Sequence, residues 1–187
     1  MARAHTDKRS RLVSAAVGLA YQNGFGATSL ADIAREAEVP LGNVYYYFKT
    51  KDEIGEAIVE LRLAQLAAQR QRWEESESPK DRLCACVQDV FENRDFLAQR
   101  GCAVGTLCSE LHKAGGVVAT RATEIFAQHL AWIESQFRAL GKGHDSSRLA
   151  VHLLSAMQGV SILAHALHDT GLVAMETERL KSWIQNL

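Results

Sequence analysis

Proline is scarce in this chain, with only Pro40 and Pro79 among 187 residues. Long helices are therefore permitted, because proline is the residue that most strongly interrupts an α-helix. The chain also lacks any stretch with the two-residue alternation of apolar and polar residues that marks a solvated strand. Together these absences predict an all-α protein of about nine helices.

Long apolar runs are missing as well. No segment reaches the roughly 18 consecutive apolar residues expected of a membrane span. Residues 1–10 are polar, unlike the start of a signal peptide. We therefore expect a cytoplasmic protein that has no membrane partner.

The chain has no Cys-x-x-Cys pair, so its cysteines do not form a zinc signature. His152, His165 and His168 share one predicted helix but have no carboxylate support, which disfavours a metal site. The sequence also offers no oriented set of cysteine, histidine and acid for nucleophilic catalysis. We expect no metal, no cofactor and no enzymatic activity. The four cysteines are Cys84, Cys86, Cys102 and Cys108.

Net positive charge is absent, since the formal net charge is −1. A protein that coats DNA nonspecifically would need many more cations, because neutralising phosphates dominates such binding. The local charge is different. The first residues form a basic arm, and two lysines, Lys49 and Lys51, follow the second helix of the strongest motif of the chain. The cations of the arm are Arg3, Lys8, Arg9 and Arg11.

That motif is a helix-turn-helix over residues 28–54. Its spacing predicts a first helix at Leu30–Ala37, a turn at residues 38–40 and a second helix at Leu41–Phe48. Pro40 suits a helix start, because it has no N–H group to leave unpaired there. Four apolar residues are spaced to bury the inner angle between the two helices: Ile33, Ala34, Val39 and Val44.

At these residues the chain resembles the TetR family of bacterial transcriptional regulators. The matching positions are Thr28 and Ser29, then Asp32-Ile33-Ala34, then Gly42, Tyr45, Phe48, Lys51 and Asp52. Two residues depart from the family pattern. Glu38 stands where a small glycine is usual, so it would need an uncommon backbone geometry, and Leu41 stands where Lys or Arg is frequent.

The resemblance implies two domains: a three-helix DNA-binding domain at residues 1–50 and a helical ligand-binding and dimerisation domain at residues 51–187. It also implies that a double-stranded DNA operator is a partner. The predicted DNA-binding residues are Thr28, Ser29, Leu41, Gly42, Asn43, Tyr45, Tyr46, Lys49 and Lys51.

In the second domain, Ser78 and Pro79 begin a helix that we expect to reach Gln99. The Gly-Cys run within residues 100–111 resembles the family branch that includes the LmrA and YxaF repressors, which respond to drug-like or flavonoid-like compounds. We predict a pocket for a small effector, although core and pocket residues look alike in sequence. The predicted lining residues are Val87, Phe91, Val104, Leu107, Cys108, Phe126, Leu130, Met157 and His165.

The last two predicted helices, at about 145–170 and 174–186, have apolar faces that invite pairing with a second copy. A four-helix bundle of this kind is the usual dimer of the family that the chain resembles. The residues predicted for this interface are Leu149, Leu153, Met157, Val160, Leu180, Trp183 and Ile184.

The sequence therefore predicts a ligand-responsive repressor that leaves a palindromic operator when a small apolar or amphipathic molecule binds. An alternative keeps the same DNA-binding half and replaces the ligand with oxidants or electrophiles that act on Cys102 or Cys108. Burial as small apolar side chains is the simpler interpretation of all four cysteines.

Overall fold

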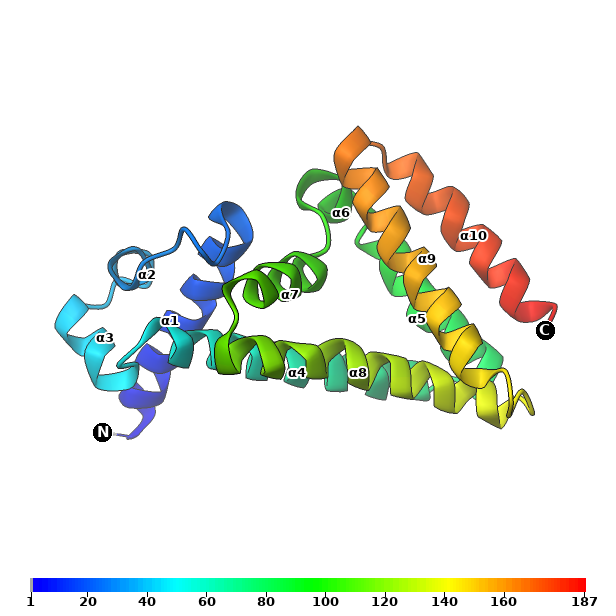
Figure 1. Ribbon diagram of the computed structural model, residues 1–187, viewed down its shortest axis with the longest axis horizontal. Helices are drawn as coiled ribbons and strands as arrows, with labels where there is room; N and C mark the ends of the chain where they lie inside the picture. The colour runs from blue at the N-terminus through cyan, green and yellow to red at the C-terminus, as the bar shows by residue number, and fades with distance from the viewer. Residues whose placement is uncertain (1) are drawn as a thin grey trace. The chain divides into compact units, whose positions relative to one another are not determined.

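The computed structural model describes residues 2–187, apart from the side chains of residues 2–7, Lys113 and Ala114. Residues 2–187 contain helices and no strand, which confirms the all-α prediction (Figure 1). The helices are α1 (Ala2–Asn23), α2 (Leu30–Glu36), α3 (Leu41–Tyr47), α4 (Lys51–Glu74), α5 (Pro79–Glu92), α6 (Arg94–Arg100), α7 (Ala103–Ala114), α8 (Gly116–Ala139), α9 (Ser146–Leu167) and α10 (Thr170–Gln185).

These ten helices correspond to the nine predicted ones because the predicted helix from Pro79 to Gln99 is divided into α5 and α6. Its start is as expected, since the Ser78 hydroxyl accepts a hydrogen bond from the Asp81 N–H at 3.1 Å. The division lies at Asn93, whose side chain donates to the Asp89 carbonyl oxygen at 2.7 Å. An asparagine that binds the backbone in this way competes with helical hydrogen bonding and favours a helix end.

The helices form two compact units. Unit 1 contains Met1–Ala64 and Ala103–Ile125, and unit 2 contains Gln65–Cys102 and Phe126–Leu187. Helices α4 and α8 contribute residues to both units. This division differs from the predicted boundary after residue 50, because α7 and the start of α8 pack with the N-terminal helices. The assignment of DNA binding and ligand binding to residues 1–50 and 51–187 stays a prediction.

In unit 1, helix α1 packs against α2 and α7. Phe25, in the loop between α1 and α2, is 6% exposed and lies in the core of this unit. The other large buried side chains around it include Leu12, Ile33, Val44, Ile54, Ile58 and Leu111.

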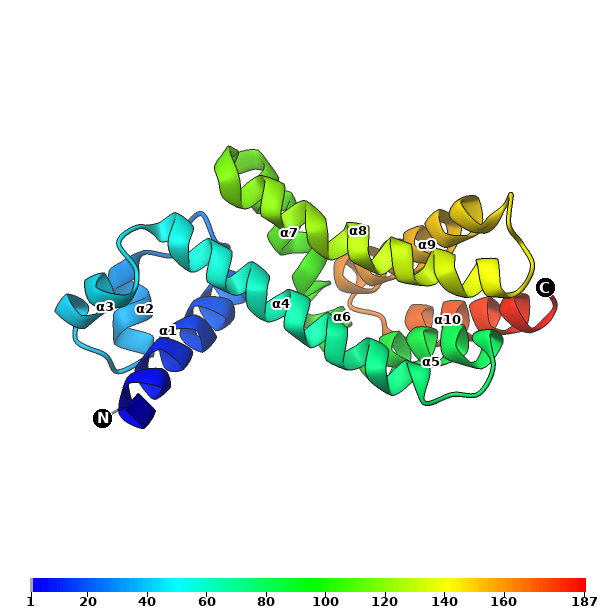
Figure 2. The same ribbon diagram turned by 90° about the horizontal axis from the view of Figure 1, so that it is seen from below.

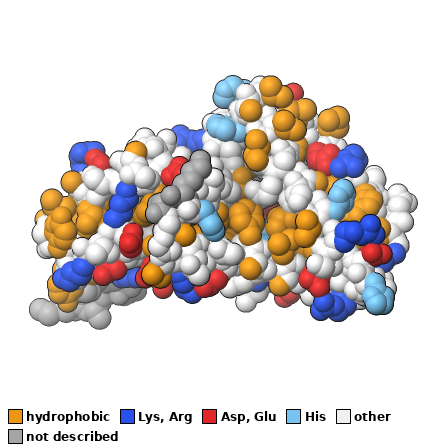
Figure 3. Space-filling model, viewed as in Figure 1, with side chains coloured by type: hydrophobic (Ala, Val, Ile, Leu, Met, Phe, Trp, Pro, Cys, Tyr) orange, Lys and Arg blue, Asp and Glu red, His pale blue; other side chains and the backbone are white. Residues whose placement is uncertain are grey.

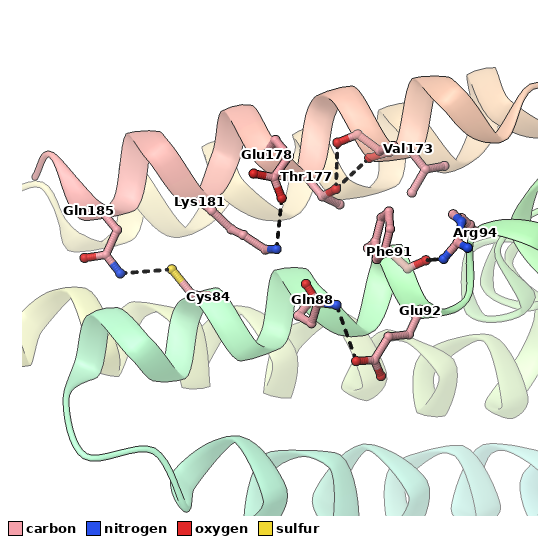
Figure 4. Close-up of polar contacts among 11 residues, drawn as sticks. Cys84, Gln88, Phe91, Glu92, Arg94, Val173, Thr177, Glu178, Lys181 and Gln185 are labelled. Carbon is pink, nitrogen blue, oxygen red and sulfur yellow. Dashed lines mark hydrogen bonds and ion pairs between the residues drawn. The ribbon is translucent and has the colours of Figure 1, made fainter.

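In unit 2, helix α10 packs against α5 and α9, and α6 packs against α9 (Figure 2). The contact between α5 and α10 is apolar at its centre and polar at its edge (Figure 4). At this edge the Gln185 side chain lies 3.5 Å from the Cys84 sulfur, and Lys80 donates to the Gln185 carbonyl oxygen at 2.7 Å. The fully buried apolar residues include Leu83, Val87, Leu153, Leu180 and Ile184.

Helix α9 is the one helix of the described chain that is long and apolar enough to cross a membrane, judged by length and composition alone. A core helix passes the same test. Leu153, Met157 and Val160 of α9 are buried among the other helices of unit 2, so packing explains one of the two apolar faces of this helix.

Candidate DNA interface

Helices α2 and α3 form the predicted helix-turn-helix. The four residues expected at the inner angle are all buried: Ile33 is 1% exposed, Ala34 and Val39 are each 4% exposed, and Val44 is 0% exposed. Pro40 is the N-cap residue of α3, at the start that the sequence predicted. Burial of this angle fixes α3 against α2, so that the outer face of α3 is presented on a firm support.

The turn between the two helices contains Glu38 with φ +52°, the left-handed geometry expected where the family has glycine. Arg11 of α1 holds this turn. Its guanidinium donates to the Ala37 carbonyl oxygen, to the Glu38 carbonyl oxygen at 3.3 Å and to the Glu38 carboxylate at 3.4 Å. Arg11 therefore acts within the domain, which the sequence did not indicate because the two segments are 26 residues apart.

The start of α2 is closed by a capping box. The Ser29 hydroxyl accepts a hydrogen bond from the Asp32 N–H at 3.1 Å, and the Asp32 carboxylate accepts from the Ser29 N–H at 3.1 Å. The hydrogen bond from the Ser29 hydroxyl, with help from the Ser29 N–H and Arg35, lowers the pKa of Asp32. Thr28 is 3% exposed, and its hydroxyl donates to the Gly24 carbonyl oxygen at 2.9 Å. Both predicted DNA-binding residues thus shape the backbone before α2.

The outer face of α3 is apolar and exposed. Leu41 is 42% exposed, Tyr45 47% and Tyr46 66%, while Asn43 is half-buried. Gly42 lies between them, and a Cβ atom built there would have nothing within 4 Å. Figure 3 shows hydrophobic side chains at the α3 end of the molecule, with lysine and arginine side chains around them. The Tyr46 ring lies edge-on to the Tyr47 ring, with a centroid distance of 5.2 Å.

Two lysines flank this face. Lys49 donates to the Tyr45 carbonyl oxygen at 2.6 Å and so caps the C-terminus of α3. Lys51 donates to the Gly26 carbonyl oxygen at 2.8 Å, and its ammonium lies 4.9 Å from the centroid of the Phe25 ring. Each ammonium has further donor positions. Contact of either lysine with DNA stays a prediction.

The basic arm at the N-terminus forms the first part of α1. Arg9 lies 3.9 Å from the Glu60 carboxylate and 5.3 Å from the centroid of the Phe48 ring. The side chain of Arg3 lies outside the described residues. Arg9 and Arg11 therefore face partners within unit 1, and Lys8 is half-buried.

The predicted effector residues are divided between the two units. Unit 1 holds Val104, Leu107 and Cys108, and unit 2 holds the rest. Within unit 2, Val87 and Met157 are buried, whereas His165 is exposed. The remaining members of the set, Phe91, Phe126 and Leu130, are half-buried. A role for any of these residues in effector binding stays a prediction.

A small pocket within unit 1 includes one of these residues, Leu107. It is lined by α1, α4 and α7, with Tyr21, Arg62 and Thr106 as its polar side chains. Val17, Ala20, Ile58 and Ala103 complete it.

The structure brings together a cysteine and a histidine in unit 2 that the sequence did not associate. The Cys86 sulfur lies 3.5 Å from Nε2 of His129, and the His129 ring stacks on Trp73 with a centroid distance of 5.8 Å. Burial raises the pKa of the Cys86 thiol. Burial, with the charge of Arg70, lowers the pKa of His129 to about 4. Both groups are therefore neutral near pH 7, unlike the activated thiolate of a cysteine nucleophile.

Among the side chains that the structure describes, no group of three or more His, Cys, Asp or Glu is arranged to hold a metal ion. His165 and His168 each place Nδ1 3.4 Å from the Ala98 carbonyl oxygen, at the end of α9. Their positions are explained by this packing around the C-terminus of α9.

The residues predicted for the dimer interface mostly face the core of a single chain. Leu153, Leu180 and Ile184 are 0% exposed, and Met157 and Val160 are buried as well. Leu149 and Trp183 are half-buried, with Trp183 against His152 and Phe137. The large apolar side chains of α9 and α10 that are exposed to solvent are Val151, Ile162, Leu163, Leu167 and Met175. The sequence did not separate the two faces because α9 carries an apolar stripe on each.

Comparison with known proteins agrees with this geometry. The family model described as bacterial regulatory proteins, tetR family, matches residues 12–58, which include α2, α3 and the turn between them. A solved TetR-family transcriptional regulator from Streptomyces coelicolor superposes with a TM-score of 0.83 over 97% of this chain and 94% of that chain, at 20% identity. Residues 12–58 belong to the TetR family, and the chain as a whole has the TetR-family fold.

Two relatives illustrate the kinds of TetR-family protein that the chain is similar to. The HTH-type transcriptional repressor DhaR of Mycobacterium sp. strain GP1 is 26% identical over 148 residues, which cover 78% of this chain and 72% of DhaR. The HTH-type transcriptional repressor NemR of Escherichia coli is 31% identical over 110 residues, which cover 56% of this chain and 52% of NemR. The solved reduced form of NemR superposes with a TM-score of 0.76 at 21% identity, over 94% of this chain and 96% of that chain.

The chain thus carries a TetR-family DNA-binding domain, and the relatives that it resembles are described as transcriptional repressors and not as enzymes. Its alignment with NemR spans about half the length of that relative. Membership of the LmrA and YxaF branch stays a prediction.

Proposed function

We propose that this protein is a cytoplasmic, ligand-responsive repressor that binds a palindromic operator as a homodimer. The outer face of α3 is the observation that carries the proposal, because Leu41, Tyr45 and Tyr46 are exposed on a helix whose other face is locked in the domain core. In helix-turn-helix proteins the second helix enters the major groove. The relatives DhaR and NemR are both described as HTH-type transcriptional repressors.

Each part of the α3 face has a role in this proposal. The Tyr46 hydroxyl reaches a phosphate, and Leu41 and Tyr45 offer apolar contact to base edges such as thymine methyl groups. Gly42 lets the backbone of α3 approach the DNA. Lys49 and Lys51 add positive charge beside the phosphates while they hold backbone oxygens of their own domain.

The homodimer is proposed to form through α9 and α10. Ile162, Leu163 and Leu167 are 65%, 54% and 64% exposed on α9, and Met175 is 66% exposed on α10. Large apolar side chains clustered on a surface mark an interaction site. A second copy is the partner that a palindromic operator requires, because its half-sites must match two α3 helices about 34 to 36 Å apart.

Release is proposed to follow from a small apolar or amphipathic effector that favours a different spacing of the two α3 helices. The proposed lining residues include Leu107 of α7, which lines the pocket of unit 1. Because the effector and the operator favour different states of one dimer, each weakens binding of the other by the same factor. Effector binding therefore needs no direct contact with DNA.

Fluorescence anisotropy with labelled DNA from the promoter beside the gene tests the proposal. Wild-type protein should bind with an affinity that falls steeply between about 50 and 200 mM salt. Tyr46→Ala should weaken binding about tenfold or more, since it removes an exposed side chain of α3. Phe96→Ala is the matched control, because Phe96 is an exposed aromatic residue of α6 (47% exposed) and lies in unit 2. Equal loss in the two variants, or no specific site in a genome-wide selection with wild-type protein, would refute the assignment of α3.

A thiol-based switch is the second candidate, supported by the description of the NemR structure as a reduced form. Cys102 is half-buried just before α7, and the Cys108 sulfur lies 3.5 Å from the Ala122 carbonyl oxygen. Under this candidate hydrogen peroxide releases the operator from wild-type protein, and Cys102→Ser or Cys108→Ser prevents the release. If peroxide has no effect on wild type, or releases the operator from both variants as readily as from wild type, the candidate is eliminated.

A further inference from the structure

The loop between α1 and α2 leads directly into the helix-turn-helix, and a carboxylate of α7 holds it within unit 1. The Glu110 side chain accepts a hydrogen bond from the Phe25 N–H. The same carboxylate lies against Gly24, which has φ +87°. A Cβ atom built on Gly24 would be only 2.9 Å from a Glu110 oxygen. Glu110 thus binds the loop beside Gly24, where no side chain covers the backbone.

The side chain of Phe25 and the backbone of Gly26, in the same loop, contact residues of α4. A Cβ atom on Gly55 of α4 would come within 3.1 Å of the Phe25 ring and 2.9 Å of Val118 of α8. The Phe25 ring therefore packs closely against Gly55 of α4, and Val118 of α8 packs against the same glycine. Lys51 of α4 also donates to the Gly26 carbonyl oxygen at 2.8 Å. The hydrogen bond from the Phe25 N–H to Glu110 ties the loop backbone to α7.

We infer that Glu110 is a positioning residue that couples α7 to the DNA-binding helices through the Phe25 amide, an inference that rests on the proposed function. Leu107 and Cys108, which are buried on α7, lie within one helical turn of Glu110. A helix moves as a rigid element, so a change in packing around these two residues displaces Glu110 with them. The hydrogen bond of a carboxylate to a backbone N–H is charge-assisted and directional. Displacement of α7 therefore pulls the loop or breaks this bond.

Coupling of this kind is reciprocal, so operator DNA must in turn change the behaviour of α7. This permits a test that needs no known effector. Hydrogen–deuterium exchange of the full-length protein is measured with and without operator DNA. In wild type, DNA should slow amide exchange in α2 and α3, which it touches, and also in residues 103–112 of α7, which it does not touch.

Glu110→Ala should raise the exchange rate of the Phe25 amide about tenfold or more. It should also abolish the response of α7 to DNA while the response of α2 and α3 persists. Glu110→Gln keeps the volume and an acceptor oxygen but loses the charge, so it should give intermediate values and serves as the test if the alanine variant does not fold. Glu124→Ala is the matched control: it removes one carboxylate of unit 1 that pairs with Arg121 at 2.8 Å, and it should behave as wild type.

A graded loss of the α7 response from wild type to Glu110→Gln to Glu110→Ala supports the coupling. An equal response of α7 in all three proteins, with operator binding intact, overturns the coupling and leaves the proposed function standing. Absence of operator binding by wild-type protein overturns the proposed function and this inference together.

Discussion

Replacing Glu38 with glycine should stabilise the protein, although it removes a salt bridge. Glu38 has φ +52°, and an L-residue in the left-handed region costs about 1–2 kcal/mol that glycine does not incur. Glycine loses more conformational freedom on folding, which offsets about 0.5–1 kcal/mol. The Arg11–Glu38 pair is 3.4 Å long and its side chains are 39% and 88% exposed, so its loss costs only about 0–0.5 kcal/mol.

The net gain is about 0.5 kcal/mol, which raises Tm by about 1–2 °C for a chain of this length. The bonds from Arg11 to the carbonyl oxygens of Ala37 and Glu38 involve the backbone and survive the substitution. Circular dichroism melts at a fixed protein concentration measure the shift, because dimerisation makes Tm depend on concentration.

Two further variants separate the backbone effect from the charge. Glu38→Ala keeps the left-handed geometry and loses the carboxylate, so it should melt at or slightly below the wild-type temperature. Glu36→Gly, two residues earlier in the last turn of α2, should destabilise by about 0.5–1 kcal/mol, because glycine is unfavourable inside a helix. If Glu38→Gly melts no higher than Glu38→Ala, the argument from backbone geometry is refuted.

Three other predictions concern DNA affinity, pH and thiol chemistry. Gly42→Ala should have a free energy of unfolding equal to that of wild type or up to about 0.5 kcal/mol higher, because the added Cβ atom has no neighbour within 4 Å. The variant should nevertheless bind the operator more weakly in anisotropy titrations. Unchanged affinity would place Gly42 away from the DNA. The pKa of His129 is lowered to about 4 in the folded protein, so the unfolded chain binds more protons below about pH 6.5. Denaturant titrations should therefore show the free energy of unfolding falling by about 2 kcal/mol from pH 7.5 to 5. His129→Gln should remove the part of this decrease that comes from protonation of His129. Iodoacetamide should label Cys86 in native protein far more slowly than Cys102, because Cys86 is 0% exposed and its thiol pKa is raised; comparable rates by mass spectrometry would contradict this.

The helix-turn-helix was predicted closely because its signals are local. The capping residues Ser29 and Asp32, the start at Pro40 and the apolar spacing of Ile33 and Val44 all act within a few residues of one another. Even the unusual geometry of Glu38 followed from one position in the motif.

The partners of the charged residues could not be predicted in the same way. Arg11, expected in a basic arm for DNA, holds a turn 26 residues away, and the Lys51 ammonium holds a carbonyl oxygen 25 residues away. A long flexible side chain can reach either solvent or a distant backbone oxygen. Only the packing of the helices decides between them.

The sequence by itself determined the all-α class, the helix-turn-helix and the family, since helix periodicity, capping and turn geometry are properties of neighbouring residues. The tertiary structure decided which of the two apolar stripes of α9 lies in the core, which unit holds each predicted effector residue, and that Glu110 of α7 meets the Phe25 amide 85 residues away. These outcomes depend on how helices distant in sequence pack together. An amphipathic pattern shows that a face is buried, but it does not show what covers that face.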